Sequence, residues 1–214
     1  MALVVTAGSL AGQQPGVHPV SGRVFAQPMG VQGAPWLERA ERQEEEDPER
    51  ALRILKIPKG AVVADVGAGS GYMSIRMAKI VGPDGKVYAN DIQLGMLDLL
   101  RKNAEKAKLT NVTPVLGTVE DPRLPAGALD LILMVDVYHE FSQPQKMLQK
   151  MREALKPSGR LVLVEYRGED PSVPILPEHK MTRAQVKLEV EHEGFTLASV
   201  NEDLPRQHLF VFTR

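Results

Sequence analysis

Three glycines and two acidic residues lie where a small ligand could meet the main chain. The stretch ADVGAGSGY places Gly67, Gly69 and Gly71 at every second position behind Asp65. A turn without side chains lets a ligand lie against main-chain N–H groups at a helix N-terminus. Asp91 ends the next apolar run, where an acidic side chain can accept both hydroxyls of a ribose. We therefore expect a ligand that contains a nucleoside.

The spacing of these glycines narrows the choice of ligand. A dinucleotide site is typically G-x-G-x-x-G, in which the helix N-terminus holds a pyrophosphate. This chain has G-x-G-x-G, with Asp65 two positions before the first glycine. A carboxylate at that point suits an amino-acid ammonium group better than it suits phosphates. The pattern therefore favours a nucleoside that carries an amino-acid part.

Histidines supply the candidate proton acceptors. His139 follows an apolar run within DVYHEF, where it could take a proton from a nucleophile near neutral pH, or cap the following helix. Tyr138 is a candidate substrate contact, with packing against a helix as the alternative. His179 is a second candidate contact, with a solvated loop as the alternative. The five histidines are scattered along the sequence, so we expect no metal site.

The elements that must position these residues alternate between strands and helices from residue 60 onward. Short runs rich in valine and isoleucine are typical of buried strands, and amphipathic stretches between them are typical of helices. Such an alternation predicts a Rossmann-like, doubly wound α/β fold with a mostly parallel sheet and helices on both faces. The expected strands are AVVADVG, KVYANDI, NVTPVLG, ALDLILMVDV and RLVLVEY; the expected helices are GYMSIRMAKIVG, QLGMLDLLRKNAEKAKL and PQKMLQKMREAL.

The two ends of the chain differ from this pattern. After a helix capped by Thr182, two strands separated only by a turn predict an antiparallel hairpin, and so an antiparallel C-terminal strand. Residues 1–35 form an N-terminal arm, which we expect to be a partly ordered lid, and residues 36–214 form the ligand-binding domain. A helix is expected from Trp36 to Ile54, broken at Pro48. The run EEED inside it is expected to be a solvated face or a helix start.

These motifs resemble those of the class I S-adenosylmethionine-dependent methyltransferases, from about Gly60 to the C-terminus. The branch that they resemble most is the small-molecule one, which includes enzymes like the ubiquinone and menaquinone methyltransferases. The resemblance implies S-adenosylmethionine as the cofactor. ADVGAGSG matches the first motif of the family, and NDI matches the second. The expected C-terminal hairpin also agrees with that family.

The resemblance also implies roles for single residues. It puts Asp65, Gly67, Gly69 and Gly71 around the methionine part of the cofactor, Asp91 on the ribose, Ile92 against the adenine, and Asp136 beside the amino end. In the family, an aspartate often reaches the adenine amino group from a Gly-Asp-Ala segment. This chain has Thr118 there, with the Val119 main chain and Glu120 or Asp121 as substitute contacts.

Composition limits the partners. With 26 basic and 27 acidic residues, the net charge of -1 gives no reason to expect a nucleic acid or an anionic membrane. The absence of cysteine suits a reducing compartment, so we expect a cytoplasmic enzyme. The alternative is export, since residues 1–16 contain a short apolar run like that of a signal peptide. No motif indicates an oligomeric state.

The expected function is therefore the transfer of a methyl group from S-adenosylmethionine to a small-molecule acceptor. His139 is the candidate catalytic residue, and the motifs do not say whether oxygen, nitrogen, sulfur or carbon is methylated. Two alternatives stay open from the sequence. One is a nicotinamide-dependent Rossmann oxidoreductase, and the other is a non-catalytic S-adenosylmethionine-binding partner subunit.

Overall fold

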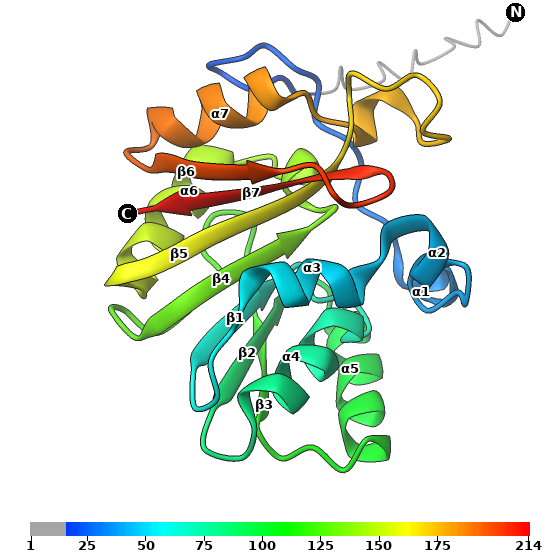
Figure 1. Cartoon of the computed structure of the whole chain (residues 1–214), viewed down its shortest axis with the longest axis vertical. Helices are drawn as coiled ribbons and strands as arrows, with labels where there is room; N and C mark the ends of the chain where they lie inside the picture. The colour runs from blue at the N-terminus through cyan, green and yellow to red at the C-terminus, as the bar shows by residue number, and fades with distance from the viewer. Residues whose placement is uncertain (1–15) are drawn as a thin grey trace, which may run out of the picture.

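The computed structural model describes residues 16–214, and a seven-stranded sheet forms its centre (Figure 1). The strand order is β3-β2-β1-β4-β5-β7-β6, in which β7 runs antiparallel to both of its neighbours and the other neighbouring pairs are parallel. The expected Rossmann-like α/β fold is therefore confirmed. The strands are β1 (Val62–Val66), β2 (Lys86–Asp91), β3 (Val112–Leu116), β4 (Leu129–Val135), β5 (Leu155–Tyr166), β6 (Thr196–Asn201) and β7 (Gln207–Thr213).

The central strands are apolar on both faces, because helices cover both. In β4, Leu131 and Leu133 point into one core, while Ile132 and Met134 point into the other, and all four are at most 1% exposed. Alternate residues of a strand face opposite sides of a sheet, so a strand buried on both sides has a continuous apolar sequence.

Helices form the two outer layers of the fold, one on each face of the sheet (Figure 1). On one face lie α3 (Pro48–Leu55), α4 (Tyr72–Val81) and α5 (Leu94–Lys106). On the other face lie α6 (Pro144–Ala154) and α7 (Arg183–His192). The side chain of Thr182 accepts a hydrogen bond from the Gln185 N–H, which confirms the expected cap of α7.

The region before α3 differs from the single broken helix that was expected. It contains a 3-10 turn η1 (Val31–Gly33) and two short helices, α1 (Ala34–Leu37) and α2 (Arg42–Glu46). The break at Pro48 is confirmed, because Pro48 is the first residue of α3. The solvated EEED face is wrong for Glu46, which is 1% exposed. Its carboxylate accepts hydrogen bonds from the Arg39 and Arg42 guanidinium groups. These two positive charges balance the negative charge of the buried glutamate.

The carboxyl ends of the parallel strands carry the irregular segments. Two 3-10 turns, η2 (Tyr138–Glu140) and η3 (Pro177–His179), follow β4 and β5. The N-terminal arm reaches the same edge, where the Ala26 N–H donates to the carbonyl of His139 at 3.1 Å. The apolar run at the start of the chain lies mostly outside the described residues. Among the helices of residues 16–214, none is long and apolar enough to cross a membrane.

Candidate active site

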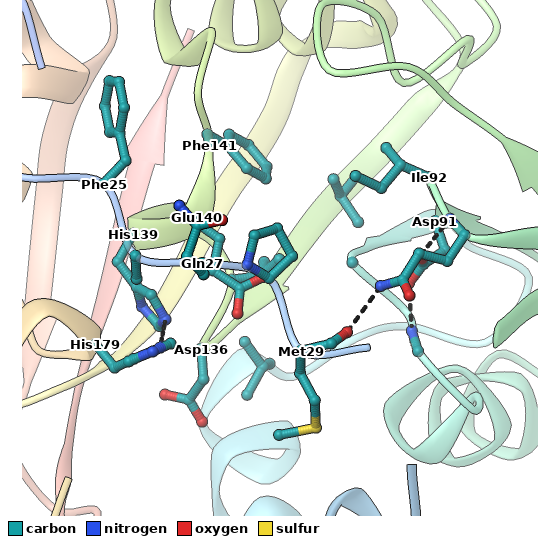
Figure 2. A pocket seen from close by; sticks show the side chains of 18 of the residues that line it. Phe25, Gln27, Met29, Asp91, Ile92, Asp136, His139, Glu140, Phe141 and His179 are labelled. Carbon is teal, nitrogen blue, oxygen red and sulfur yellow. Dashed lines mark hydrogen bonds between the residues drawn. The ribbon is translucent and has the colours of Figure 1, made fainter. Parts of the chain in front are cut away.

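A cavity of about 790 Å³ lies at the carboxyl edge of the sheet, where ligands bind in open α/β folds (Figure 2). Its walls come from the glycine turn, the ends of β2 and β4, the loop after β5 and the N-terminal arm. Asp91 and Ile92 lie at one end of the view, and His139, His179 and Phe25 lie at the other, with Met29 between them. One cavity thus joins the predicted nucleoside site to the predicted proton acceptor.

The three glycines of the turn have different surroundings. Gly67 and Gly69 line the cavity with φ angles of 75° and 53°, values that residues with a side chain rarely adopt. A Cβ atom on Gly69 would lie 2.8 Å from the Leu37 Cδ1 atom. Gly71 is not part of the cavity wall, because it packs against Leu100, whose Cγ would lie 2.9 Å from an added Cβ. Its φ angle of 93° and the close packing of α4 on α5 together explain Gly71.

Asp65 lies beneath the turn and not on the wall of the main cavity. It borders a small adjoining hollow of about 40 Å³, together with Arg42 and Tyr72. The Ser74 hydroxyl donates to its Oδ2 at 2.6 Å. Burial is the main influence and raises the pKa of Asp65 to about 6, against the opposing effect of Ser74. A ligand in the main cavity would therefore contact Asp65 only by reaching into this hollow.

Asp91 joins the ends of β1 and β2 at the nucleoside end. Its Oδ2 accepts from the Gly69 N–H at 2.9 Å and its Oδ1 from the Gln93 N–H at 2.8 Å. Burial raises the pKa of Asp91, and these N–H groups oppose the shift. Ile92 is 42% exposed at the cavity wall, where a flat base could cover it. Asp91 is thus both the candidate ribose ligand and the group that holds the glycine turn.

Thr118 and Val119 both line the cavity, as expected for the adenine end. The Thr118 hydroxyl accepts from the Asp121 N–H at 3.0 Å, so it closes its own turn. The side chain of Val119 is 48% exposed. These positions fit an apolar contact and main-chain recognition of a base.

Asp136 presents a buried oxygen without a protein partner among the described residues. Its φ angle is 51°, and its Oδ2 accepts from the Gln207 side chain at 2.6 Å. Its Oδ1 has no hydrogen-bond partner, although the residue lines the cavity. Burial first, and then the nearby Glu46 and Glu165, raise the pKa of Asp136 well above its ordinary value. A buried acceptor of this kind fits the ammonium group of an amino-acid ligand.

His139 is held between two other side chains. Its Nδ1 lies 2.6 Å from the Glu165 Oε2, and its Nε2 lies 3.1 Å from the His179 Nδ1. The helix-capping alternative is wrong, because Gln143 is the N-cap of α6 and the His139 side chain points elsewhere. The histidines were expected to lie apart, and this expectation was wrong for His139 and His179, which are in contact. Forty residues separate them in sequence, but η2 and η3 bring them together.

Of the two candidate substrate contacts, His179 lines the cavity and Tyr138 does not. Tyr138 is fully buried and lies outside the cavity wall, where its ring packs on Phe141 and the Arg23 guanidinium. The packing alternative therefore explains Tyr138. His179 does line the cavity, and burial lowers its pKa. It is not the solvated loop histidine of the alternative.

Several residues of the site had not been recognised in the sequence. Arg42 and Glu140 line the cavity, and Glu165 holds His139. Glu165 has a sequence signal, because a charged residue inside the apolar run RLVLVEY requires a buried partner. Arg42 carries no such signal, because only the tertiary structure brings it to the strand ends. The arm had been expected as a lid, and its residues 25–29 line the cavity.

Comparison with known proteins supports the same family. Residues 57–204 match a family model described as a methyltransferase domain. A demethylmenaquinone methyltransferase from Listeria welshimeri is 28% identical over 123 residues, which are 58% of this chain and 51% of that protein. A protein-L-isoaspartate O-methyltransferase from Methanococcoides burtonii is 35% identical over 111 residues, 51% of each chain. The chain thus spans about half the length of these curated relatives.

A solved structure extends the match to most of the chain. The crystal structure of a SAM-dependent methyltransferase from Aquifex aeolicus has a TM-score of 0.82 and 28% sequence identity. The match covers 86% of this chain and 98% of that one. Together with the G-x-G-x-G turn, Asp91 and the antiparallel β7, these similarities show that the chain belongs to the class I S-adenosylmethionine-dependent methyltransferase family.

Proposed function

We propose that this protein transfers a methyl group from S-adenosylmethionine to a small, largely apolar molecule. The observation that carries the proposal is the continuous cavity, which joins the glycine turn and Asp91 to an apolar region beside His139. When bound, the cofactor supplies a methyl group already activated by a sulfonium, so the protein's contribution is mainly positioning.

The described residues fit this cofactor. Gly69 lines the cavity without a side chain, so a ligand can lie against its main chain, and Asp91 is placed for the ribose hydroxyls. We assign the ammonium group to the unpartnered Oδ1 of Asp136. We assign the carboxylate to Arg42, whose guanidinium is fixed at the cavity wall by bonds to Glu46 and to the Leu37 carbonyl.

The acceptor is placed at the opposite end of the cavity. Phe25, Phe141 and Leu176 give that end an apolar surface, and His139 and His179 give it basic nitrogens. With its Nδ1 proton directed to Glu165, His139 accepts at Nε2 from the His179 Nδ1–H at 3.1 Å, and once His179 turns aside this lone pair can take a proton from the acceptor. The relatives are named for different acceptors, so the cavity walls alone support this choice.

The proposal places the reaction in the cytoplasm, with a free small molecule and not a nucleic acid as the partner. The balanced charge and the lack of cysteine support this. The arm, with its residues 25–29 on the cavity wall, is proposed to act as a lid over the acceptor.

Release of S-adenosylhomocysteine over a panel of acceptors tests the proposal. The panel should contain apolar molecules with hydroxyl, thiol, amine and activated carbon groups. His139→Ala should lower turnover by roughly 100-fold or more while leaving cofactor affinity nearly unchanged. His192→Ala is the matched control, because His192 is an exposed histidine outside the cavity.

Each result of this experiment has a definite meaning. Cofactor binding without turnover on any acceptor would favour the non-catalytic partner subunit. Binding of NAD(H) in place of S-adenosylhomocysteine would favour the oxidoreductase, which the glycine spacing and the family match oppose. A His139→Ala variant with more than about a third of wild-type turnover would remove His139 from the proton transfer.

A further inference from the structure

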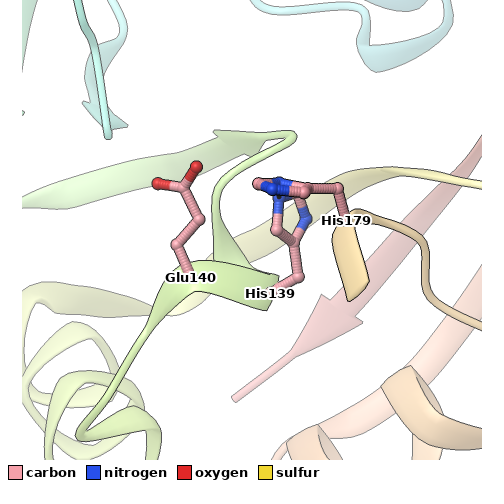
Figure 3. Close-up of side chains that lie close together, drawn as sticks. All are labelled: His139, Glu140 and His179. Atoms are coloured by element: carbon pink, nitrogen blue, oxygen red, sulfur yellow. Dashed lines mark hydrogen bonds between the residues drawn. The ribbon is translucent and has the colours of Figure 1, made fainter. Parts of the chain in front are cut away.

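Two histidines and a glutamate form a compact cluster at the acceptor end of the cavity. His139, Glu140 and His179, here called the His–Glu–His cluster, each offer a ligand atom, and these atoms all lie within 4.8 Å of one another (Figure 3). We propose that this cluster binds one divalent transition-metal ion, which in turn binds the ionised oxygen of the methyl acceptor. Only the acceptor part of this inference rests on the proposed function.

The distance between the two ring nitrogens fits a shared ion. Bonds of about 2.1 Å from zinc to each nitrogen separate the nitrogens by about 3.0 Å at a right angle and about 3.4 Å at the tetrahedral angle. The His139 Nε2 and the His179 Nδ1 lie 3.1 Å apart in a hydrogen bond, which an ion would replace as His179 carries its proton on Nε2 instead. The Glu140 carboxylate is farther away, so its flexible side chain must rotate inward to complete the set.

Glu165 orients His139 as a metal ligand requires. Both residues are at most 2% exposed, and the Glu165 Oε2 lies 2.6 Å from the His139 Nδ1. The other carboxylate oxygen accepts from the Tyr138 N–H at 2.9 Å, which fixes the glutamate in turn. The Nδ1 proton therefore faces Glu165, and the Nε2 lone pair faces His179 and the cavity. Histidine ligands of metals commonly have such a carboxylate on their other nitrogen.

The backbone holds the turns that carry the two histidines in place before any ion binds. His139 and Glu140 belong to η2, whose Phe141 N–H donates to the Tyr138 carbonyl at 3.1 Å. His179 ends η3, and its N–H donates to the Leu176 carbonyl at 3.0 Å. The two turns follow the neighbouring strands β4 and β5, and the Met181 N–H donates to the Tyr166 carbonyl at 2.9 Å, which ties the loop of His179 back to the end of β5.

The donor set selects the kind of ion. Two imidazole nitrogens and one carboxylate suit Zn²⁺, Fe²⁺ or Co²⁺, whereas Mg²⁺ and Ca²⁺ prefer oxygen donors. Three protein ligands leave further positions of the ion open. Because the cluster lines the cavity, these positions face the acceptor.

The ion defines the class of acceptor. A hydroxyl that binds such an ion becomes more acidic, so its proton leaves to solvent as the oxygen–metal bond forms. The adjoining walls are apolar, with Phe25, Phe141 and Leu176. The cluster therefore suits an apolar molecule that carries a phenol or enol hydroxyl. When the ion is bound, the His139 lone pair is its ligand, and the ion takes over the activation of the acceptor.

Metal titration of the tag-free, full-length protein tests the site without any measurement of turnover. After treatment with a chelator and its removal, the protein should bind one equivalent of Zn²⁺ in calorimetry, and one of Co²⁺ with the absorption bands of a nitrogen and oxygen site. Excess Mg²⁺ or Ca²⁺ should not compete. His139→Ala and His179→Ala should each weaken Zn²⁺ binding by more than about 100-fold, beyond the range for a group that only orients a ligand.

Two further variants separate a ligand from an orienting group. Glu165→Gln should weaken Zn²⁺ binding by about 10- to 100-fold, because it disturbs only the orientation of His139. His192→Ala is the control and should bind Zn²⁺ like the wild type. If His139→Ala fails to fold, His179→Ala on the loop carries the test.

Several results would overturn the metal site. These are wild-type protein that binds neither Zn²⁺ nor Co²⁺, equal affinity in the folded His179→Ala variant, and displacement of Zn²⁺ by Mg²⁺. Binding of S-adenosylhomocysteine, measured in parallel on the metal-free protein, reports on the proposed function separately. Loss of that binding with intact Zn²⁺ binding would reject the methyltransferase proposal and keep the metal site.

Discussion

Asp91 shows how one side chain can serve both the fold and the ligand. Its two oxygens accept from the main chain of Gly69 and Gln93, and each oxygen retains a second lone pair for a ribose hydroxyl. Asp91→Ala should therefore weaken S-adenosylhomocysteine binding by roughly 1.5 to 3 kcal/mol, the range for hydrogen bonds to a charged group. Calorimetry measures the change, and an unaltered affinity would show that the ribose is held elsewhere.

Gly69 can be tested against a glycine that shares its backbone strain. Gly60 has a φ angle of 78° and no heavy atom within 4 Å of an added Cβ, whereas an added Cβ at Gly69 meets Leu37 at the cavity wall. Alanine in this conformation costs about 1 to 2 kcal/mol at either position. Gly69→Ala should also reduce S-adenosylhomocysteine affinity by roughly 10-fold or more through crowding. Equal affinities in folded Gly69→Ala and Gly60→Ala proteins would remove Gly69 from the site.

Asp65 should make stability depend on pH. Burial raises its pKa from 3.8 to about 6 in the folded chain, so the protonated form is the one that favours folding. The contribution is complete below about pH 3.8 and is lost as the pH rises through about 6, with a total of about 3 kcal/mol. Asp65→Asn cannot ionise and should not lose this stability. Urea unfolding of the cofactor-free proteins across this range measures the difference, and parallel profiles would contradict it.

At the scale of elements, the N-terminal arm is fastened at Glu189 of α7, where Arg23 forms a buried ion pair and His18 and Ser21 also contact the carboxylate. The Arg23 Nε lies 2.9 Å from the Glu189 Oε1 on α7, and these side chains are 6% and 0% exposed. The Arg23 Nη1 also donates to the His139 carbonyl at 2.8 Å. The ion pair thus connects the arm to the turn that carries His139.

Arg23→Met should release the arm while the domain stays folded. Removing one partner of a buried ion pair costs about 3 to 5 kcal/mol, and undocking the arm relieves this cost by letting water reach Glu189. We expect faster amide exchange over residues 17–29 and a higher KM for the acceptor, with a smaller change in cofactor affinity. Arg101→Met is the control, because its exposed pair with Asp98 is worth about 0 to 1 kcal/mol. Unchanged exchange in the arm would show that other contacts hold it.

At the scale of the whole molecule, cofactor binding should stabilise the domain. The cavity draws its walls from the arm, both halves of the sheet and the loop after β5, so a bound ligand links them. S-adenosylhomocysteine at about 100 times its Kd should add about 2.7 kcal/mol to the free energy of unfolding. For a chain of this size, that raises Tm by roughly 5 to 11 °C. Thermal unfolding measures the shift, NAD(H) is the control, and a Tm that neither ligand changes would contradict cofactor binding.

The sequence alone determined the sheet, the helices that cover it and the nucleoside end of the site. Strands buried on both faces must be apolar throughout, amphipathic helices must alternate, and a ligand at a helix N-terminus requires glycine. These are local requirements, so residues near one another in the chain reveal them. Gly67, Gly69 and Asp91 meet at one strand edge for that reason.

The tertiary structure decided the acceptor end. His139 and Glu165 lie on neighbouring strand ends, and His179 comes from a later loop, so their contacts depend on the strand order and not on sequence spacing. Tyr138 and Glu46 are buried because each has a partner far away in the sequence. Arg23 lies over the ring of Tyr138, and the Tyr166 hydroxyl donates to Glu46. Contacts between residues far apart in sequence leave no periodic signal, and only the folded chain brought the His–Glu–His cluster together.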